Sequence, residues 1–261
     1  MPAQVQEERI KVGGATIQVL KGGTGEPLLL LHGLEGNPGW LRYVQALADH
    51  FTVYLPSHPG FNHSECPRWL KTMPDLVCFY TWFLEQQGLE GIRAIGFSLG
   101  GWLAAELVAT TRHAFSKLLL VDAVGIKPQQ GEIADIFIAS PTQVLERSFY
   151  DPQQAPEYEQ LYGRPPGPEQ QAVAESNREM AARLCWKPYM YDPRLPFLLA
   201  RVTIPTRIVW GRQDQLVPLE CGQLYQQAIP GAALVVIDQC GHLPQVEKPE
   251  EFVRCALEFL Q

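Results

Sequence analysis

The sequence has 261 residues, 46% hydrophobic and 19% charged, which is typical of a globular domain rather than of a disordered or fibrous chain. The formal net charge is −7, from 21 Lys and Arg against 28 Asp and Glu, and no basic cluster stands out, so we predict no nucleic-acid partner. The acidic N-terminus does not resemble a signal peptide and no stretch reaches the roughly 20 apolar residues of a membrane span, so we expect a cytoplasmic protein without such a span.

The first 125 residues alternate short apolar runs with helical stretches. Residues 9–12 and 15–20 predict two strands joined in a hairpin at Gly13-Gly14. Later runs are apolar at nearly every position, as expected of strands covered on both faces of a parallel sheet. These strands are predicted at 27–32, 51–55, 92–97 and 117–121, and the helices between them at 40–50, 73–87 and 99–111. This order indicates an α/β fold with a mostly parallel central sheet and flanking helices.

Residues 126–202 have a different character. Proline is frequent, and the apolar residues fall into helical spacing, with the clearest helix predicted at 169–184. Strand patterns return at 206–210 and 233–237, and an amphipathic helix is predicted at 249–260. We therefore predict a core domain of residues 1–125 and 203–261, interrupted by an inserted helical cap (lid) domain of residues 126–202.

A G-x-S-x-G pattern at residues 96–100 lies between a predicted strand and a predicted helix. In such a turn the serine is strained so that its hydroxyl projects from the sheet, and glycines two positions away on either side avoid clashes. The N-terminus of the following helix also favours a developing negative charge. We therefore predict that Ser98 is a catalytic nucleophile.

A serine nucleophile needs a histidine to accept its proton and a carboxylate to orient that histidine. Asp214 and His242 each follow a predicted strand, so both should lie at the carboxyl ends of strands, where ligand crevices form in α/β sheets. We predict Asp214 as the acid and His242 as the base. Asp122, which follows an earlier strand, is the alternative acid.

The tetrahedral intermediate of acyl transfer needs backbone N–H groups that bind its oxyanion. One predicted donor is Leu99, the residue after the nucleophile, and the other is Leu34, in the loop that follows the strand at 27–32. Glu35 is the alternative to Leu34. We expect His32 to order this loop by hydrogen bonding rather than to touch the substrate.

Together these motifs resemble those of α/β-hydrolase fold proteins over essentially the whole chain, with a helical cap inserted after the sixth strand. The resemblance rests on His32-Gly33, Pro59-Gly60-Phe61, residues 96–101, residues 211–214 with Val217-Pro218, and Gly241-His242. It implies the catalytic order Ser98, Asp214, His242 and an enzyme that needs no cofactor. The six cysteines are scattered without the spacing of a zinc site, so we predict no metal and expect free thiols.

The resemblance implies a serine hydrolase acting on esters, thioesters, lactones, amides or activated carbon–carbon bonds. Because the nucleophile is a serine rather than an aspartate, haloalkane dehalogenases and epoxide hydrolases are disfavoured. Residues 240–247 are similar to meta-cleavage-product hydrolases, but Phe97 and Leu243 replace their usual asparagine and tryptophan, and the H-G-x-G-P-G pattern is missing. We therefore predict a carboxylesterase, with carbon–carbon bond hydrolysis as the alternative.

Two other classes share these motifs. A ligand-binding receptor with little turnover can keep the same fold and the same triad, because a fold alone does not fix a function. A lyase or a cofactor-free haloperoxidase can also carry the triad. The expected partner is in every case a small molecule, and we expect a monomer or a homodimer.

The cap is expected to roof the active site and to carry most of the substrate specificity. Trp186 and Tyr189, in an aromatic segment of the cap, are predicted to form a pocket wall. Trp40, Phe97 and Leu216, which flank the catalytic motifs, are predicted to approach the ligand. Since no Arg or Lys cluster suggests an anchor for a charged group, we predict a largely apolar acyl or aryl ester as substrate.

Overall fold

The computed structural model describes residues 4–111 and 113–261, so the first three residues of the predicted core domain, and residue 112, lie outside it. Eight strands form one sheet in the order β1-β2-β4-β3-β5-β6-β7-β8. The strands are β1 Gln6–Val12, β2 Ala15–Gly22, β3 Pro27–Leu31, β4 Thr52–Pro56, β5 Ile92–Phe97, β6 Phe115–Val121, β7 Thr206–Gly211 and β8 Ala233–Ile237. The pairs β1–β2 and β2–β4 are antiparallel, and all others are parallel. The predicted α/β class with a mostly parallel sheet is confirmed.

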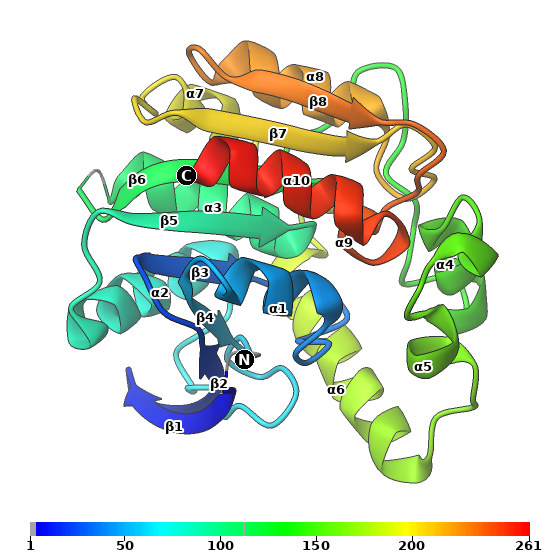
Figure 1. The fold of residues 1–261 in the computed structure, drawn as a ribbon, viewed down its shortest axis with the longest axis horizontal. Helices are drawn as coiled ribbons and strands as arrows, with labels where there is room; N and C mark the ends of the chain where they lie inside the picture. The colour runs from blue at the N-terminus through cyan, green and yellow to red at the C-terminus, as the bar shows by residue number, and fades with distance from the viewer. Residues whose placement is uncertain (1–3, 112) are drawn as a thin grey trace.

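Helices cover both faces of the sheet (Figure 1). On one face lie α1 Arg42–Ala48 and α10 Pro249–Leu260, whose apolar side chains pack in one buried cluster. On the other lie α2 Met73–Gln87, α3 Leu99–Thr110 and α8 Leu219–Ala228, which share a second cluster. The strands between the two layers are therefore apolar on both sides, as their sequence predicts.

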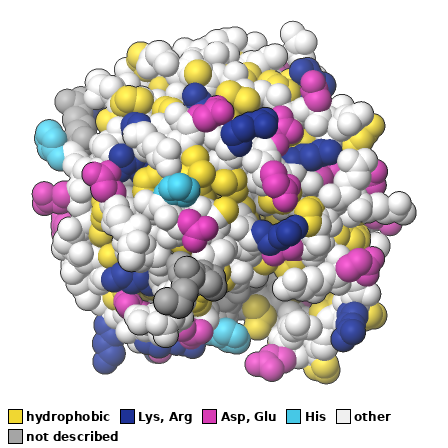
Figure 2. All heavy atoms as spheres, viewed as in Figure 1, with side chains coloured by type: hydrophobic (Ala, Val, Ile, Leu, Met, Phe, Trp, Pro, Cys, Tyr) yellow, Lys and Arg dark blue, Asp and Glu magenta, His cyan; other side chains and the backbone are white. Residues whose placement is uncertain are grey.

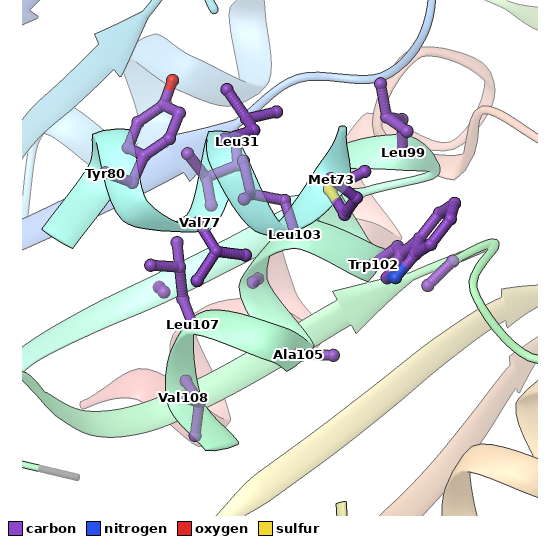
Figure 3. Packing of buried hydrophobic residues seen from close by; sticks show 14 of the residues in the cluster. Leu31, Met73, Val77, Tyr80, Leu99, Trp102, Leu103, Ala105, Leu107 and Val108 are labelled. Atoms are coloured by element: carbon purple, nitrogen blue, oxygen red, sulfur yellow. The ribbon is translucent and has the colours of Figure 1, made fainter. Parts of the chain in front are cut away.

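Helix α2 shows how local sequence and packing agree. Thr72 begins it with a capping box, in which its side chain accepts from the Asp75 N–H and Asp75 accepts from the Thr72 N–H. Gly88, in the left-handed conformation, ends it. Its buried face meets α3 around Val77 and Leu103 (Figure 3). Burying side chains of this size stabilises the fold by about 1.5–3 kcal/mol each.

The segment of residues 126–202 is helical and adds no strand to the sheet. It contains α4 Pro141–Ser148, the 3₁₀ turn η1 Pro152–Gln154, α5 Tyr158–Tyr162, α6 Pro168–Cys185 and α7 Leu195–Leu199. Helices α4, α5 and α6 lie on the side to which the strand arrows point (Figure 1), as expected of a cap over the carboxyl ends of the strands. The last helix, α7, contacts α3 and α8, so the chain returns to the core before residue 202. The division into two domains stays a prediction.

The surface carries charges of both signs. On the face shown in Figure 2, basic and acidic side chains are interspersed. Among residues 4–111 and 113–261, none of the helices is both long enough and apolar enough to cross a bilayer.

Candidate active site

Ser98 lies in the turn between β5 and α3, with φ +49° and ψ −113°. A residue other than glycine is strained when its φ lies in this range, and the close packing around the turn keeps the Ser98 backbone in this conformation. A Cβ at Gly96 would lie 2.3 Å from the Gly100 carbonyl oxygen, and one at Gly100 would lie 2.1 Å from that of Leu31. Both glycines are therefore required for this turn, which aims the Ser98 hydroxyl away from the end of β5.

A continuous chain of hydrogen bonds joins the three predicted triad residues. His242 Nδ1 donates to Asp214 Oδ2 at 2.7 Å, and Ser98 Oγ lies 3.0 Å from His242 Nε2. Because the first bond fixes the proton on Nδ1, Nε2 of the neutral imidazole is free to accept the Ser98 proton. The Asp214 side chain is fully buried and His242 is 7% exposed, so solvent screens this pair little. The geometry is that of a general base beside a serine nucleophile.

Asp214 is held in place by the loop that carries it. Its Oδ1 accepts from the Leu216 N–H at 2.8 Å and from the Val217 N–H at 2.9 Å. Side-chain atoms of Asp122, Asp214 and His242 that could bind a metal lie within 4.8 Å of one another, which is a spacing that could hold a metal ion. The hydrogen bond between His242 and Asp214 already uses the facing atoms of these two residues, and their role in a triad rather than in a metal site stays a prediction.

The pKa of His242 sets the expected pH dependence. Burial lowers this pKa, but the charge of Asp214, its hydrogen bond and the charge of Glu35 raise it more, so the net shift is upward. Only the neutral imidazole can accept the Ser98 proton, so we expect kcat/KM for an uncharged ester to fall as the pH drops through this raised pKa. The fall should therefore be centred above the pKa of about 6.5 of an ordinary histidine.

A pH–rate profile of the wild type and of Glu35→Gln measures this expectation. Removing the Glu35 charge should move the acid limb of the profile to lower pH, because that charge raises the His242 pKa. An acid limb centred below that of free histidine, or one unmoved in the variant, contradicts the assigned electrostatics.

The predicted oxyanion loop lies next to Ser98. A Cβ placed at Gly33 would be 3.9 Å from Ser98 Oγ, so the backbone of this loop approaches the nucleophile closely. Among the hydrogen bonds of the described residues, neither the Leu34 nor the Leu99 N–H is used as a donor. Both groups are therefore available to an oxyanion, and their role stays a prediction.

His32 orders this loop through two hydrogen bonds. Its Nδ1 donates to the Gly33 carbonyl at 2.7 Å, and its Nε2 accepts from the His58 N–H at 2.9 Å. Burial lowers the pKa of His32 to about 4, so the ring is neutral. His58, which the sequence did not single out, donates from Nε2 to the His32 carbonyl and contacts Tyr80 through Nδ1.

A buried asparagine of the cap holds the same loop. Asn177 of α6 is 3% exposed, donates to the Glu35 carbonyl at 2.7 Å and accepts from the Asn62 N–H at 2.7 Å. At Gly36, where φ is +96°, a Cβ would lie 2.4 Å from Asn177 Nδ2. The cap and the oxyanion loop are therefore in direct contact through one side chain, and nothing in the sequence near Asn177 marks it.

We expect Asn177→Ala and Asn177→Asp to lower kcat by about 10- to 100-fold, because a small displacement of the oxyanion loop misplaces its donors. Alanine also leaves the Asn62 N–H unpaired, which should cost about 1–3 kcal/mol of stability. Aspartate keeps the acceptor for Asn62 but sets an oxygen against the Glu35 carbonyl. The measurement is kcat on a chromogenic ester together with the melting temperature. Ser176→Ala, an exposed neighbour on α6, is the control, and variants of Asn177 with wild-type kcat refute the expectation.

The segment of residues 126–202 also contacts the loop that carries His242. The His242 N–H donates to the Ser148 carbonyl at 2.8 Å. Glu247 of α9 Pro244–Glu247, which is 1% exposed, accepts from Gly241 at 2.7 Å and from the cap residues Tyr150 at 2.9 Å and Asp151 at 2.7 Å. Three N–H groups on one carboxylate fix the cap segment and the histidine loop relative to each other.

Two predicted pocket residues lie in the core clusters. Phe97 is 5% exposed, and its ring packs against Tyr43 and Phe252 at centroid distances of 5.6 and 5.8 Å. Leu216 is 6% exposed and belongs to the cluster on the α2 and α3 side. Core packing accounts for both positions, so their role as ligand contacts stays a prediction.

The other three predicted pocket residues are more open. Trp40 is partly buried and donates to Gln45 at 3.0 Å. Tyr189 donates to the Ala134 carbonyl at 2.6 Å and lies near Trp186, with a centroid distance of 6.2 Å. Trp186 itself is 53% exposed. The structure brings the two cap aromatics together, and their contact with a substrate stays a prediction.

A cavity of about 270 Å³ opens between the oxyanion loop and α6. Its lining mixes polar and apolar groups, includes two glutamates, and comprises Glu35, Asn62, His63, Glu169, Gln170, Val173, Ala174 and Asn177. Glu35 is exposed to solvent, and its charge acts on that of His242. Two acidic side chains, Glu35 and Glu169, therefore line this cavity, and none of the predicted triad residues is among its lining residues.

The fold and this geometry define a chain of the α/β-hydrolase class with a serine at its nucleophile turn. The model of the alpha/beta hydrolase fold family matches residues 26–249, and the chain belongs to this family. The predicted superfamily is confirmed, and membership in this family supports a hydrolase function.

Among curated proteins, the chain is similar to a 2-hydroxy-6-oxo-6-phenylhexa-2,4-dienoate hydrolase of Comamonas testosteroni, with 28% identity over 92% of this chain and 89% of the relative. Among solved structures, it is similar to the hydrolase of the same name from a Rhodococcus strain, with a TM-score of 0.81, 24% identity, and 98% and 99% of the two chains covered. An esterase from Exiguobacterium antarcticum gives a TM-score of 0.72 at 21% identity, with 98% and 99% covered. The two structural likenesses show the fold alone.

Proposed function

We propose that the protein is a serine hydrolase, specifically a carboxylesterase for uncharged esters with largely apolar acyl or aryl groups. The observation that carries the proposal is the chain of hydrogen bonds from Asp214 through His242 to Ser98. It supplies the general base that a serine hydroxyl needs, at a strained turn between a strand and a helix.

The proposed reaction passes through an acyl-enzyme. Ser98 Oγ attacks the ester carbonyl while His242 Nε2 takes its proton, and Asp214 stabilises the resulting imidazolium. The N–H groups of Leu34 and Leu99 bind the oxyanion. His242 then gives the proton to the leaving alkoxide, and a water molecule activated by the same residue releases the acid.

Acidic groups near the site support an uncharged substrate. Glu35, whose charge acts on His242, lines the cavity beside the predicted oxyanion loop together with Glu169, and its described lining residues include no Lys or Arg that could pair with a substrate carboxylate. Carbon–carbon bond hydrolysis is the second candidate, because the Comamonas relative is named as a dienoate hydrolase. A dienoate is an anion, so the charge of Glu35 near His242 disfavours it by like-charge repulsion.

A substrate panel separates these functions. We expect turnover of p-nitrophenyl esters with an optimum of acyl length, and turnover of 2-hydroxy-6-oxo-6-phenylhexa-2,4-dienoate that is at least about tenfold slower in kcat/KM. Ser98→Ala supplies the background rate. A dienoate hydrolysed faster than every ester would establish the second candidate. Saturable binding of these compounds without turnover would instead favour a ligand-binding role.

A further inference from the structure

Asp122, at the carboxyl end of β6, is a buried carboxyl group that the proposed reaction does not use. The residue is 1% exposed, and its φ of +43° is a left-handed conformation. Its Oδ1 accepts from the Gly211 N–H at 2.9 Å. Its Oδ2 is buried and, among the described residues, has no donor that would pair with a carboxylate oxygen. A buried ionised oxygen without a donor is costly, so its state needs an explanation.

The neighbour of this oxygen is the acid of the triad. Side-chain oxygens of Asp122 and Asp214 and a ring nitrogen of His242 lie within 4.8 Å of one another, so the two carboxyl groups are close neighbours. A hydrogen bond between two carboxyl groups requires that one of them keeps its proton.

The hydrogen bonds around the pair decide which group keeps it. Asp214 accepts from three N–H donors, two of the backbone and one of His242, whereas Asp122 accepts from one. More donors favour the ionised form, so Asp214 carries the charge and Asp122 the proton. With the proton on its Oδ2, Asp122 can donate a hydrogen bond to Asp214, and this oxygen gains the partner that it otherwise lacks.

The other titratable groups around Asp122 act in the same direction. Glu247 of α9 is a buried carboxylate whose charge further opposes ionisation of Asp122. The Cys240 thiol, in the same loop as His242, has a pKa raised by burial and stays neutral. Burial and the charge of Asp214 raise the pKa of Asp122 well above its usual range.

We propose that Asp122 is a protonated positioning residue, which donates a hydrogen bond to Asp214 and extends the triad to Ser98, His242, Asp214 and Asp122. The inference rests on the proposed serine hydrolase. When Ser98 gives its proton to His242, Asp122 keeps its own proton, so the buried acid pair has a single negative charge opposite the imidazolium. The added donor holds Asp214 toward His242 and weakens its tendency to take the imidazole proton.

The same position makes Asp122 a reserve acid. In Asp214→Asn the neighbouring charge is gone, so Asp122 can ionise and face the imidazolium that forms during the reaction. The loss of kcat in Asp214→Asn should then be smaller than the roughly 10,000-fold loss that follows an aspartate-to-asparagine change in a triad without a second acid.

Asparagine is a close mimic of a protonated aspartic acid, and it tolerates the left-handed conformation. We therefore expect Asp122→Ala, which removes the donor to Asp214, to lower kcat/KM by about tenfold, and Asp122→Asn, which keeps a donor there, to recover most of that loss and to leave the acid limb of the pH profile in place. In the Asp214→Asn background Asp122→Asn should cost at least about a further tenfold, so the two effects are strongly non-additive. Asp192→Asn, which changes a buried aspartate paired with Arg194, controls for a merely structural loss.

An ionised Asp122 gives the opposite results. Its replacement would then remove a charge near His242 and shift the acid limb to lower pH. That shift, or equal effects of Asp122→Asn in the two backgrounds, overturns the proposal.

Two readouts do not depend on turnover. The infrared difference spectrum of wild type minus Asp122→Asn should show the carbonyl band of a protonated carboxylic acid at neutral pH, and its absence overturns the proposal. The pKa of His242, followed by NMR, should be the same in both proteins. Labelling of Ser98 by a fluorophosphonate tests the proposed hydrolase separately, so failure of that function and failure of this inference are distinguishable.

Discussion

Ser98→Ala is expected to lower kcat/KM for ester hydrolysis by at least about 10,000-fold, because it removes the attacking oxygen while leaving the rest of the triad in place. The fold should be unaffected. The side chain is small and 7% exposed, and the strained backbone of the turn is held by its neighbours rather than by the hydroxyl. Intact mass after treatment with a fluorophosphonate should show one adduct on the wild type and none on the variant.

Ser116→Ala is the matched control. Ser116 lies on β6, is partly buried and hydrogen-bonds the Ile92 carbonyl at 3.2 Å, so the change removes a serine hydroxyl of the sheet outside the site. Its kcat/KM and labelling should equal those of the wild type. Ester hydrolysis retained in purified Ser98→Ala, with unchanged melting temperature, would remove Ser98 from the mechanism.

The central strands could be predicted because they are covered on both faces, so that each appears as a continuous apolar run, whereas β1 and β2 could be predicted from the hairpin turn at Gly13-Gly14. The ends of helices were harder to place. The helix predicted at residues 40–50 is α1 at Arg42–Ala48, since Leu41 is extended and Trp40 uses its indole to bond Gln45. Helix α8 was not predicted, although the parallel connection between β7 and β8 requires a crossover.

The predicted triad residues lie in the loops that follow strands, so their place in the sequence predicts that they meet at the carboxyl edge of the sheet. The contacts that hold the catalytic loops could not be found in this way. Asn177 bonds Asn62 across 115 residues, and Glu247 bonds Tyr150 across 97 residues, so no local pattern connects them. The same limit applies to Phe97. In a strand that is apolar on both faces, sequence does not tell which face a residue takes, and the structure places its ring beside Tyr43 of α1.

Gly100→Ala is expected to have the largest effect on stability. Helix propensity alone would favour alanine by about 1 kcal/mol, since Gly100 lies within α3. The Cβ, however, would lie 2.1 Å from the Leu31 carbonyl oxygen and 2.5 Å from that of His32. These are backbone atoms at the end of a central strand, and they cannot turn away as a flexible side chain can.

The steric effect should therefore outweigh propensity and lower the free energy of unfolding by more than about 3 kcal/mol, beyond the usual range for overpacked cores. That loss is a large part of the roughly 5–15 kcal/mol that stabilises a typical domain. Urea denaturation of Gly100→Ala and Gly167→Ala measures it. At Gly167, which begins α6, the only atom near a Cβ is 4.0 Å away, so this variant should lose less than about 1 kcal/mol. Equal midpoints for the two variants would show that β3 and α3 can separate, and the close contact would then not be what holds Ser98 in its strained turn.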